Sequence, residues 1–531
     1  MIRPFSHSTS LQLFSRVISV FIIVLLLQAC DSGPKSFEEL IEGKVSAQVN
    51  PFKRVPLGGK FDFKTTQPVK VKVEVKGKNP IKKSYSSFST RHSIPVLGLY
   101  AGTSNEVVLE LTTQEDQTFS KSFTLGTDPL PEFFPTVEID QIDRSKMEPG
   151  MHLIEMLIAN NGKFQSYTII FDDAGDIRWF MDMSSTGQIT YSALRNSLGN
   201  WLYLDWIDLY ELDNLGREVK KEQLFNFAGN HYLEELPNGN VVMGGSRKDA
   251  AVRRSDGRQV VTRFDHVVEW NRRENRPGKH WDLAEVLDID RAVFQEDYSL
   301  DFAADWFHLN SIAMTEDGSI IASGRNQGIV KVDTDNNPQW ILAPHVAWGK
   351  AGRAGNGRET KNFLLTALDK NGQPLPASVQ QGSQPADDFE WSTGQHSLNW
   401  LGDGRLLIFD NGLARNLSNN PTYSRAVEYQ IDEENRTIQQ VWQYGKERGL
   451  DMYSPITSDV DILPRTGNRL IIAGNIRVKQ DTPHSKLIEL KGDEVVFECR
   501  VLFKDAKGTG EKSWAQFDLV FKGERYSLYG N

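Results

Sequence analysis

The chain has 531 residues, of which 39% are hydrophobic and 24% are charged, which is ordinary for a soluble protein and long enough for two or more domains. Its 70 acidic and 60 basic residues give a net charge of −10, and no basic run suggests nucleic-acid binding. Because the overall charge is negative, local cations would have to attract any anionic substrate.

The N-terminal segment is typical of an export signal. Two arginines and no acid precede the apolar stretch 17–29, which is too short to span a membrane comfortably. The next residue completes Leu-Gln-Ala-Cys, which resembles a bacterial lipobox. We therefore expect a signal peptide at 1–29, a lipidated Cys30 and a tether at 30–39 that anchors the protein without spanning the membrane. Asp31 resembles an inner-membrane retention signal and predicts a periplasmic protein anchored there; the alternative is an ordinary signal peptide with a chance cysteine.

Residues 40–127 alternate apolar and polar residues at a period of two, as in "VKVKVEVKGK" and "EVVLELTT". Turn residues separate these runs at short intervals, which predicts a small β-sandwich. The following segment, 128–150, contains the proline-rich "GTDPLPEFFPTVEID" and is expected to be a linker.

From about residue 151 to 531 the chain repeats two kinds of hairpin. One kind has a glycine-containing turn, as in "NHYLEELPNGNVVMGG"; the other has a polar turn and often closes on tryptophan, as in "IVKVDTDNNPQWIL". Two hairpins make one four-stranded blade, so six pairs predict an all-β, six-bladed β-propeller. The first hairpin, near 167–180, is expected to pair with the C-terminal hairpin and close the ring. The long insertion 343–395 is expected on the face that carries the binding site.

Polar residues recur at the start of the predicted innermost strands. His231, Asn310, His396 and Asp459 each stand eight residues before a turn glycine, and His308 precedes Asn310 by two residues, which places both on one side of a strand. Such strand starts ring the central channel of a propeller. A single histidine there would more often line a wet channel, but three of only ten indicate a site.

Two arginines end the return strands of these hairpins at matching places, Arg325 and Arg247. Beside His308, the Arg325 guanidinium suits a tetrahedral oxyanion such as sulfate, phosphate or a carboxylate. The alternative for three histidines is a zinc triad, but an adjacent arginine argues against a bound cation, so no metal is expected. The sequence contains no P-loop, Rossmann fingerprint, G-x-S-x-G or H-E-x-x-H, and no cofactor is expected.

The motifs "FHLNSIAMTEDGSIIASGRNQGIVKVD", "GQHSLNWLGDGRLLIFDNG", "NHYLEELPNGN" and "MYSPITSDVDILPRTGN" resemble the bacterial arylsulfate sulfotransferases over most of 130–531. The resemblance implies transfer of a sulfuryl group from an aryl sulfate to a phenolic acceptor by a ping-pong mechanism, through a sulfohistidine and without a nucleotide sulfate donor. It matches His396 to the nucleophile, and His231, His308 and Arg325 to other active-site residues. Asn310 lies within a matched motif and is expected to bind substrate.

The expected chemistry explains these residue types. Sulfuryl transfer resembles phosphoryl transfer, with a loose transition state and charge on the equatorial oxygens. A neutral imidazole can attack sulfur directly, so His396 would split the reaction into two displacements. His308 or His231 would protonate the departing aryl oxygen, and Arg325 would hold the sulfuryl oxygens.

Two features depart from that family. Its members often carry a disulfide near the nucleophile, whereas 346–395 contains no cysteine, and the expected lipid anchor is absent from soluble periplasmic members. The remaining cysteine, Cys499, shares a strand face with apolar residues and is expected to be a buried thiol. A non-catalytic envelope scaffold and a metal-dependent propeller hydrolase or lyase are the competing hypotheses. The sequence leaves open the physiological donor and acceptor, the general acid and whether the enzyme dimerises.

Overall fold

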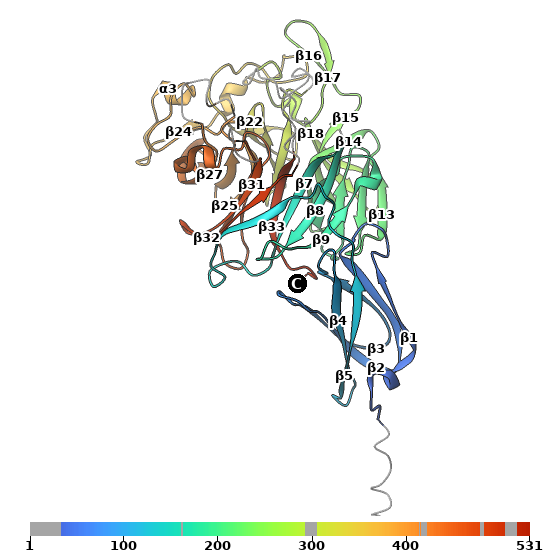
Figure 1. Cartoon of the computed structure of the whole chain (residues 1–531). Helices are drawn as coiled ribbons and strands as arrows, with labels where there is room; N and C mark the ends of the chain where they lie inside the picture. Colours follow the sequence, from blue (N-terminus) through green and yellow to red (C-terminus); the bar gives the residue numbers. More distant parts are fainter. Residues whose placement is uncertain are drawn as a thin grey trace, which may run out of the picture.

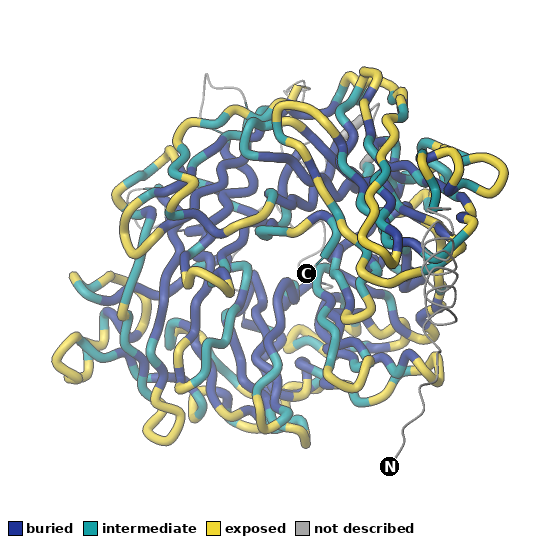
Figure 2. Tube along the Cα trace, turned by 90° about the horizontal axis from the view of Figure 1, so that it is seen from below, coloured by how far each residue is buried: buried dark blue, intermediate teal, exposed yellow. Residues whose placement is uncertain are grey.

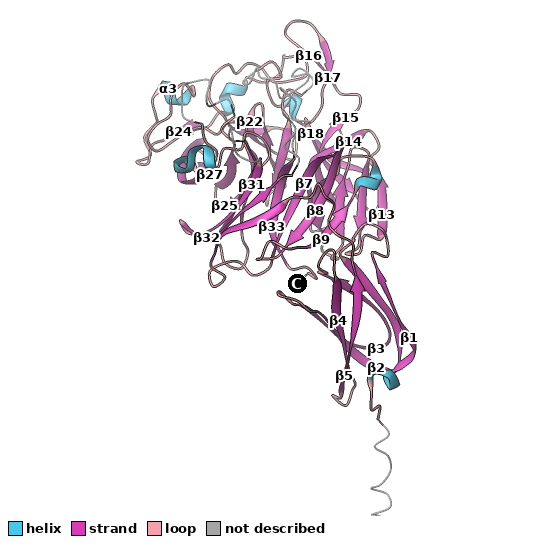
Figure 3. Cartoon of the chain, in the orientation of Figure 1, coloured by secondary structure: helices cyan, strands magenta, loops and turns pink. Residues whose placement is uncertain are grey.

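The computed structural model describes residues 33–160, 163–291, 305–413, 415, 422–477, 483–504 and 518–530. Strands dominate this structure (Figure 3), which confirms the all-β prediction. The expected signal peptide, Cys30 and Asp31 lie outside the described residues. Within the described ranges, no helix combines the length and apolar character needed to cross a membrane. The helical segments are α2 (Phe37–Leu40), α3 (Ala377–Gln380) and 3₁₀ turns at Ser184–Thr186, Leu283–Glu285, Thr360–Phe363 and Lys446–Asp451.

The N-terminal domain is a sheet of five antiparallel strands that folds over itself. The first half of β2 pairs with β1 and the second half with β4, while β3 follows almost all of β2 along the other edge. Strand β1 lies against β5, so the two halves of the folded sheet enclose a core. Alternate residues of β2, such as Val71, Val73 and Val75, point into this core. Helix α2, which begins within the expected tether 30–39, caps this core with Phe37 and Leu40. The strands are β1 (Ile41–Val49), β2 (Gly58–Val75), β3 (Ile81–Leu97), β4 (Ser104–Thr112) and β5 (Thr118–Gly126).

Six further sheets of four or five strands surround a central axis, which is a β-propeller (Figures 1 and 2). From the innermost strand outward, the first sheet contains β10 (Tyr191–Arg195), β11 (Trp201–Leu204), β12 (Asp208–Leu212) and β13 (Glu218–Gln223). The second contains β14 (Phe227–Glu235), β15 (Val241–Arg247), β18 (His266–Asn271) and β19 (Arg276–Asp282). The third contains β20 (Leu309–Met314), β21 (Ile320–Gly324), β22 (Gly328–Val332) and β23 (Pro338–Leu342). A separate hairpin joins β16 (Ala251–Arg253) and β17 (Gln259–Val261).

The remaining three sheets complete the ring. They are β25 (His396–Gly402), β26 (Arg405–Asp410), β27 (Arg425–Asp432), β28 (Thr437–Tyr444) and β24 (Thr366–Ala367); β29 (Asp459–Ile462), β30 (Arg469–Ile476), β31 (His484–Lys491), β32 (Glu494–Leu502) and β6 (Thr136–Ile142); and β33 (Leu519–Tyr526), β7 (Met151–Asn160), β8 (Lys163–Phe171) and β9 (Ile177–Asp182). The innermost strands of successive sheets, β10, β14, β20, β25, β29 and β33, contact one another in turn.

Two strands from near the N-terminal domain close the ring, and this differs in detail from the expectation. The hairpin near 167–180, formed by β8 and β9, was expected to pair with the C-terminal hairpin. The C-terminal strand β33 pairs instead with β7, the strand that precedes this hairpin. Strand β6 lies within the expected linker 128–150 and extends the fifth sheet by pairing with β32. Cys499 of β32 lies opposite Ile139 of β6 and is fully buried, which confirms the buried thiol.

The insertion 343–395 covers the outside of the fourth sheet. Its strand β24 pairs in parallel with β28, the outermost original strand of that sheet. The insertion lies at the end of the propeller away from the N-terminal domain (Figure 1), and none of its described residues lines the cavity at the starts of the innermost strands. Its outer part lies along the edge of the fourth sheet, where β28 offers backbone partners, while the carbonyl of its last residue, Gln395, accepts a hydrogen bond from the cavity residue Asn310.

The candidate active site

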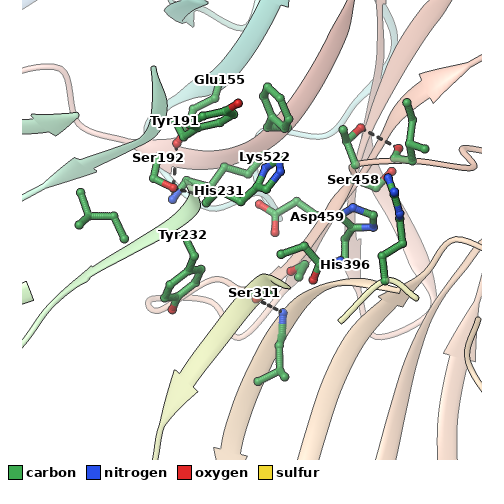
Figure 4. A pocket seen from close by; sticks show the side chains of 18 of the residues that line it. Glu155, Tyr191, Ser192, His231, Tyr232, Ser311, His396, Ser458, Asp459 and Lys522 are labelled. Atoms are coloured by element: carbon green, nitrogen blue, oxygen red, sulfur yellow. Dashed lines mark hydrogen bonds and ion pairs between the residues drawn. The ribbon is translucent and has the colours of Figure 1, made fainter. Parts of the chain in front are cut away.

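One cavity of about 450 Å³ opens where the innermost strands begin, a size that suits a small aromatic ligand (Figure 4). All five predicted residues line it: His231, His308, Asn310, Arg325 and His396. They come from the second, third and fourth sheets, as the repeat alignment predicts. Arg247, by contrast, lies on the surface and pairs with Asp249, so the two arginines are not equivalent.

The backbone aims these side chains inward by local strain. Ser192, His231, His308, Ser397 and Ser458, each at or near the start of an innermost strand, have positive φ between 41° and 85°. A non-glycine residue in this region costs about 1–3 kcal/mol, and such residues cluster at functional sites. The strand pairing shifts register at three of these residues, Ser192, His231 and Ser397, and in β20 at Asn310, and each irregularity re-aims side chains at the start of an innermost strand.

The neighbours of His396 fix the orientation of its ring and determine which ring nitrogen carries the proton. Its Nδ1 lies 2.8 Å from Asn411 Oδ1 and 3.1 Å from the Gly394 carbonyl oxygen. The amide nitrogen of Asn411 donates to the carbonyls of Ser454 and Thr457, both at 2.8 Å, which fixes its oxygen towards the ring. Both neighbours of Nδ1 are therefore acceptors, so Nδ1 carries the proton and Nε2 keeps its lone pair.

His396 is neutral over a wide pH range. Burial lowers its pKa to about 3, and the positive charge of Arg325 acts in the same direction, while the hydrogen bond to Asn411 opposes it. A ring that stays neutral with an unprotonated Nε2 is a competent nucleophile throughout the physiological range.

His308 forms a tight pair with a carboxyl group. Its Nδ1 lies 2.5 Å from Asp305 Oδ2. Burial raises the pKa of Asp305 to about 7, although the charges of Arg325 and Arg263 lower it. Burial and the same two arginines hold the pKa of His308 well below its usual value. The pair therefore gains or loses one proton near neutral pH while the imidazole itself stays uncharged.

His231 and Arg325 complete this end of the cavity. The ring of His231 lies 5.3 Å from that of His308 and 4.9 Å from Tyr191, and burial holds its pKa well below the usual value. The backbone N–H of Arg325 donates to the His308 carbonyl at 3.1 Å, which ties the arginine to the histidine strand. Arg325 and Arg263 thus provide the positive charge that an oxyanion requires.

Asn310 presents an acceptor. Its amide nitrogen donates to the Gln395 carbonyl at 2.7 Å, and its Oδ1 is buried without a hydrogen-bond partner among the described residues. The unpaired lone pair of this amide oxygen repels negatively charged sulfuryl oxygens but suits a hydroxyl group that donates a hydrogen bond. This geometry favours contact with the O–H group of a bound phenol rather than with an oxyanion.

A buried ion network holds the segment before His396. Asp410 accepts hydrogen bonds from Arg425 at 2.9 Å, from Arg415 and from the backbone of Thr393 at 2.9 Å. Arg425 and Arg415 also reach Glu390, through its carbonyl and carboxylate respectively. The loop before His396 is therefore held by ion pairs and hydrogen bonds.

The ligands of a metal site are not assembled here. No three histidine, cysteine, aspartate or glutamate side chains within the described ranges are arranged to hold an ion.

Sequence reasoning missed Asp305, Arg263 and the role of Asn411. Asp305 precedes His308 by three residues in "DWFHLN", and such spacing is a usable signal for a carboxylate–histidine pair. Asn411 belongs to the "DNG" motif after the His396 hairpin. Arg263 gave no signal, since it lies in an irregular segment before β18.

Comparisons with known proteins give a consistent result. A model described as arylsulfotransferase (ASST) matches residues 136–510, and one described as an arylsulfotransferase Ig-like domain matches 46–128. Arylsulfate sulfotransferase AssT of Escherichia coli O6:H1 is 29% identical, with 86% of this chain and 89% of that protein covered. The protein of the same name from Lelliottia amnigena is also 29% identical, with coverages of 79% and 83%. The solved extracellular domain of a two-component system from B. thetaiotaomicron matches with 9% identity and a TM-score of 0.29, covering 84% of this chain and 53% of that chain.

Proposed function

This chain belongs to the arylsulfotransferase family, and from that premise we propose that it moves a sulfuryl group from an aryl sulfate to a phenol through a sulfohistidine at His396. The observation that carries the proposal is the fixed tautomer of His396, which leaves Nε2 as a free nucleophile beside Arg325. No nucleotide sulfate donor enters this scheme.

In the first step, Nε2 of His396 attacks the sulfur of the donor. The N–S bond forms as the bond between sulfur and the aryl oxygen breaks, and Arg325 stabilises the charge on the sulfuryl oxygens. The proton on Nδ1 remains hydrogen-bonded to Asn411, so the sulfurylated ring keeps a positive charge. That charge makes the ring a good leaving group in the second step.

The pair of Asp305 and His308 supplies and recovers the proton. In its protonated state, Asp305 donates to Nδ1 of His308, whose Nε2–H protonates the departing phenolate while Nδ1 takes the proton of Asp305. The acceptor phenol then attacks sulfur, the N–S bond breaks, and the phenolic proton returns to Nε2 as Nδ1–H passes back to Asp305. Asn310 Oδ1 can orient the acceptor hydroxyl.

This scheme predicts opposite pH dependences for the two steps. With an unactivated aryl sulfate, the first step should slow as pH rises above about 7, because the Asp305–His308 pair has then lost the proton that the leaving phenolate needs. The second step should slow as pH falls below about 7, because the pair then already holds a proton and cannot take one from the acceptor phenol. With a nitrophenyl donor, whose leaving group needs no proton, the first step should be flat down to about pH 5 because the pKa of His396 is far lower. Rapid-quench measurement of phenol release and of acceptor sulfation separates the steps.

A scaffold would release no phenol from any aryl sulfate in this assay. With the nitrophenyl donor, a decline in the rate of the first step as pH falls through the ordinary histidine pKa of about 6.5 would contradict the proposal that His396 stays neutral. Simple hydrolysis, with phenol release but no acceptor sulfation, would support a sulfatase instead.

We also propose that Cys30 carries a lipid that anchors the enzyme to the periplasmic side of the inner membrane. The lipobox-like sequence and the aspartate that follows support this. Cys30→Ala should abolish incorporation of labelled fatty acid and release the protein from the membrane fraction. Retention of the variant in that fraction would show that the anchor is not a lipid on Cys30.

A further inference from the structure

The cavity carries opposite charges on two walls. Arg325, Arg263 and the neutral histidines surround the proposed reaction centre. A second set of lining residues, here called the acidic wall, contains five carboxyl groups and a single lysine: Glu155, Glu234, Asp459, Asp461, Glu524 and Lys522. Figure 4 shows Asp459, Lys522 and Glu155 in the same cavity as His396 and His231.

The strands set the spacing between the reaction centre and the acidic wall. Glu234 follows His231 by three residues on β14, which corresponds to about 10 Å along an extended strand. Asp461 follows Asp459 by two residues on β29, so both point to the same side about 7 Å apart. Aromatic and apolar side chains, including Tyr232, Phe264 and Phe521, line the cavity together with these groups. Such a space suits an aromatic ring bearing a short arm.

The single lysine does not balance the five carboxyl groups. Lys522 lies opposite Glu155 in the β33–β7 pairing, with its Nζ 3.6 Å from Glu155 Oε1 and 3.2 Å from Glu524 Oε1. Glu155 is only 6% exposed, and its Oε1 accepts no hydrogen bond from any described residue. Lys522 therefore faces this oxygen as an ion-pair partner at 3.6 Å without a hydrogen bond to it, so the oxygen can still accept a hydrogen bond from a ligand N–H.

Burial opposes the charged form of these carboxyl groups, and the charge of Lys522 acts in the other direction. Burial raises the pKa of Glu155 to about 7 and the pKa of Glu234 above its usual value. Burial likewise raises the pKa of Asp459, and for Asp461 the neighbouring charge of Asp459 adds to the effect of burial. A cation among these groups would reverse part of that cost.

A metal ion does not fit this wall, because metal ligands must converge on one point and these carboxyl groups, in the described part of the chain, do not. A primary ammonium on a flexible arm needs only one or two acceptors within reach, a negative potential and an aromatic face such as that of Tyr232. The hydroxyl of Tyr232 donates to Glu234 at 2.9 Å, which leaves the carboxylate oriented in the cavity.

We propose that the acidic wall binds the ammonium group of the acceptor, so that the preferred acceptors are phenols with a short aminoalkyl arm. This inference rests on the proposed function: the phenolic oxygen lies at the sulfurylated His396 while the ammonium lies among Glu155, Glu234 and Asp461. A phenol with an anionic arm is repelled by the same groups.

Three phenols of similar reactivity test this directly: 4-(2-aminoethyl)phenol, its neutral N-acetyl derivative and 3-(4-hydroxyphenyl)propanoate. With nitrophenyl sulfate as donor, the wild-type kcat/KM for the ammonium phenol should exceed that for the neutral phenol by at least about 10-fold, as expected for one charged hydrogen bond. The anionic phenol should be the poorest. In Asp461→Asn/Glu234→Gln, the ratio of ammonium to neutral phenol should fall several-fold towards unity. The control Asp403→Asn makes the same chemical change on an exposed turn and should keep the wild-type ratio.

The outcomes separate the two proposals. A wild-type ratio near unity, or a preference for the anionic phenol, would overturn the ammonium site and leave sulfuryl transfer intact. A strong preference that survives the double substitution would also overturn it, because the selectivity would then arise elsewhere. If no phenol is sulfated while nitrophenol is still released, the acceptor step fails and both proposals fall. The wild-type comparison decides the matter even if the double variant does not fold.

Discussion

His396→Ala is expected to lower the rate of sulfuryl transfer on the order of 10⁴-fold or more, the scale on which loss of a covalent nucleophile acts. Asp305, His308 and Arg325 remain in the variant and can still bind a donor, but the nitrogen proposed to attack the sulfur, Nε2 of His396, is gone. The loss should therefore appear in the first chemical step, measured as the burst of phenol from an aryl sulfate, with little change in overall stability.

His280→Ala is a matched control, because His280 is exposed on β19 and lies outside the cavity. It should retain wild-type rates. Substantial transfer by His396→Ala, within about 10-fold of wild type, would mean that the acceptor attacks the donor directly and that no covalent intermediate is required.

The second large effect is expected at Asn411, which does not touch the substrate but fixes the tautomer of His396. Asn411→Ala should slow the first step on the order of 10²–10³-fold. Loss of a tautomer-fixing partner costs about 10⁴-fold in the serine protease triad, and the Gly394 carbonyl here still accepts from Nδ1. Neighbouring Ser454 and Thr457 would lose two hydrogen bonds, so thermal unfolding must be measured alongside.

Asn411→Asp separates positioning from simple structural damage. The aspartate keeps an acceptor beside Nδ1 but adds a negative charge, which raises the pKa of His396 from its low value of about 3. The nitrophenyl step, flat in the wild type, should then decline as pH falls through the raised pKa. Asn435→Ala, on an exposed turn, should change neither rate nor profile. An unchanged pH profile in Asn411→Asp would show that Asn411 supports the loop without controlling the ring.

The sequence predicted the propeller, and that residues from several hairpins lie together, because both depend on local repetition. Alternating hairpins define the strands, and counting back from each turn glycine brought His231, Asn310, His396 and Asp459 to one cavity. The paired carboxyl Asp305 was accessible in principle from its spacing to His308. Arg263 was not, since its placement depends on how an irregular segment folds against the third sheet.

The errors arose where non-local pairing decides the structure. Strand β6 is flanked by prolines and looked like a linker, yet it pairs with β32 from about 360 residues later in the chain. The pairing of β24, within the insertion 343–395, with the outer edge of the fourth sheet was also not evident from the sequence, because it depends on the backbone groups that the distant strand β28 offers. Similarly, the network around Asp410 that holds the nucleophile's loop comprises residues from three separate segments.

The covalent state of His396 is the central claim, and mass spectrometry of rapidly quenched protein tests it most directly. With an aryl sulfate alone, one added sulfuryl group should appear on the peptide that contains His396. It should be absent in His396→Ala and should disappear from the wild type when a phenol is added. An adduct on the peptides of His231 or His308, or continued transfer with no adduct on any histidine, would contradict the account.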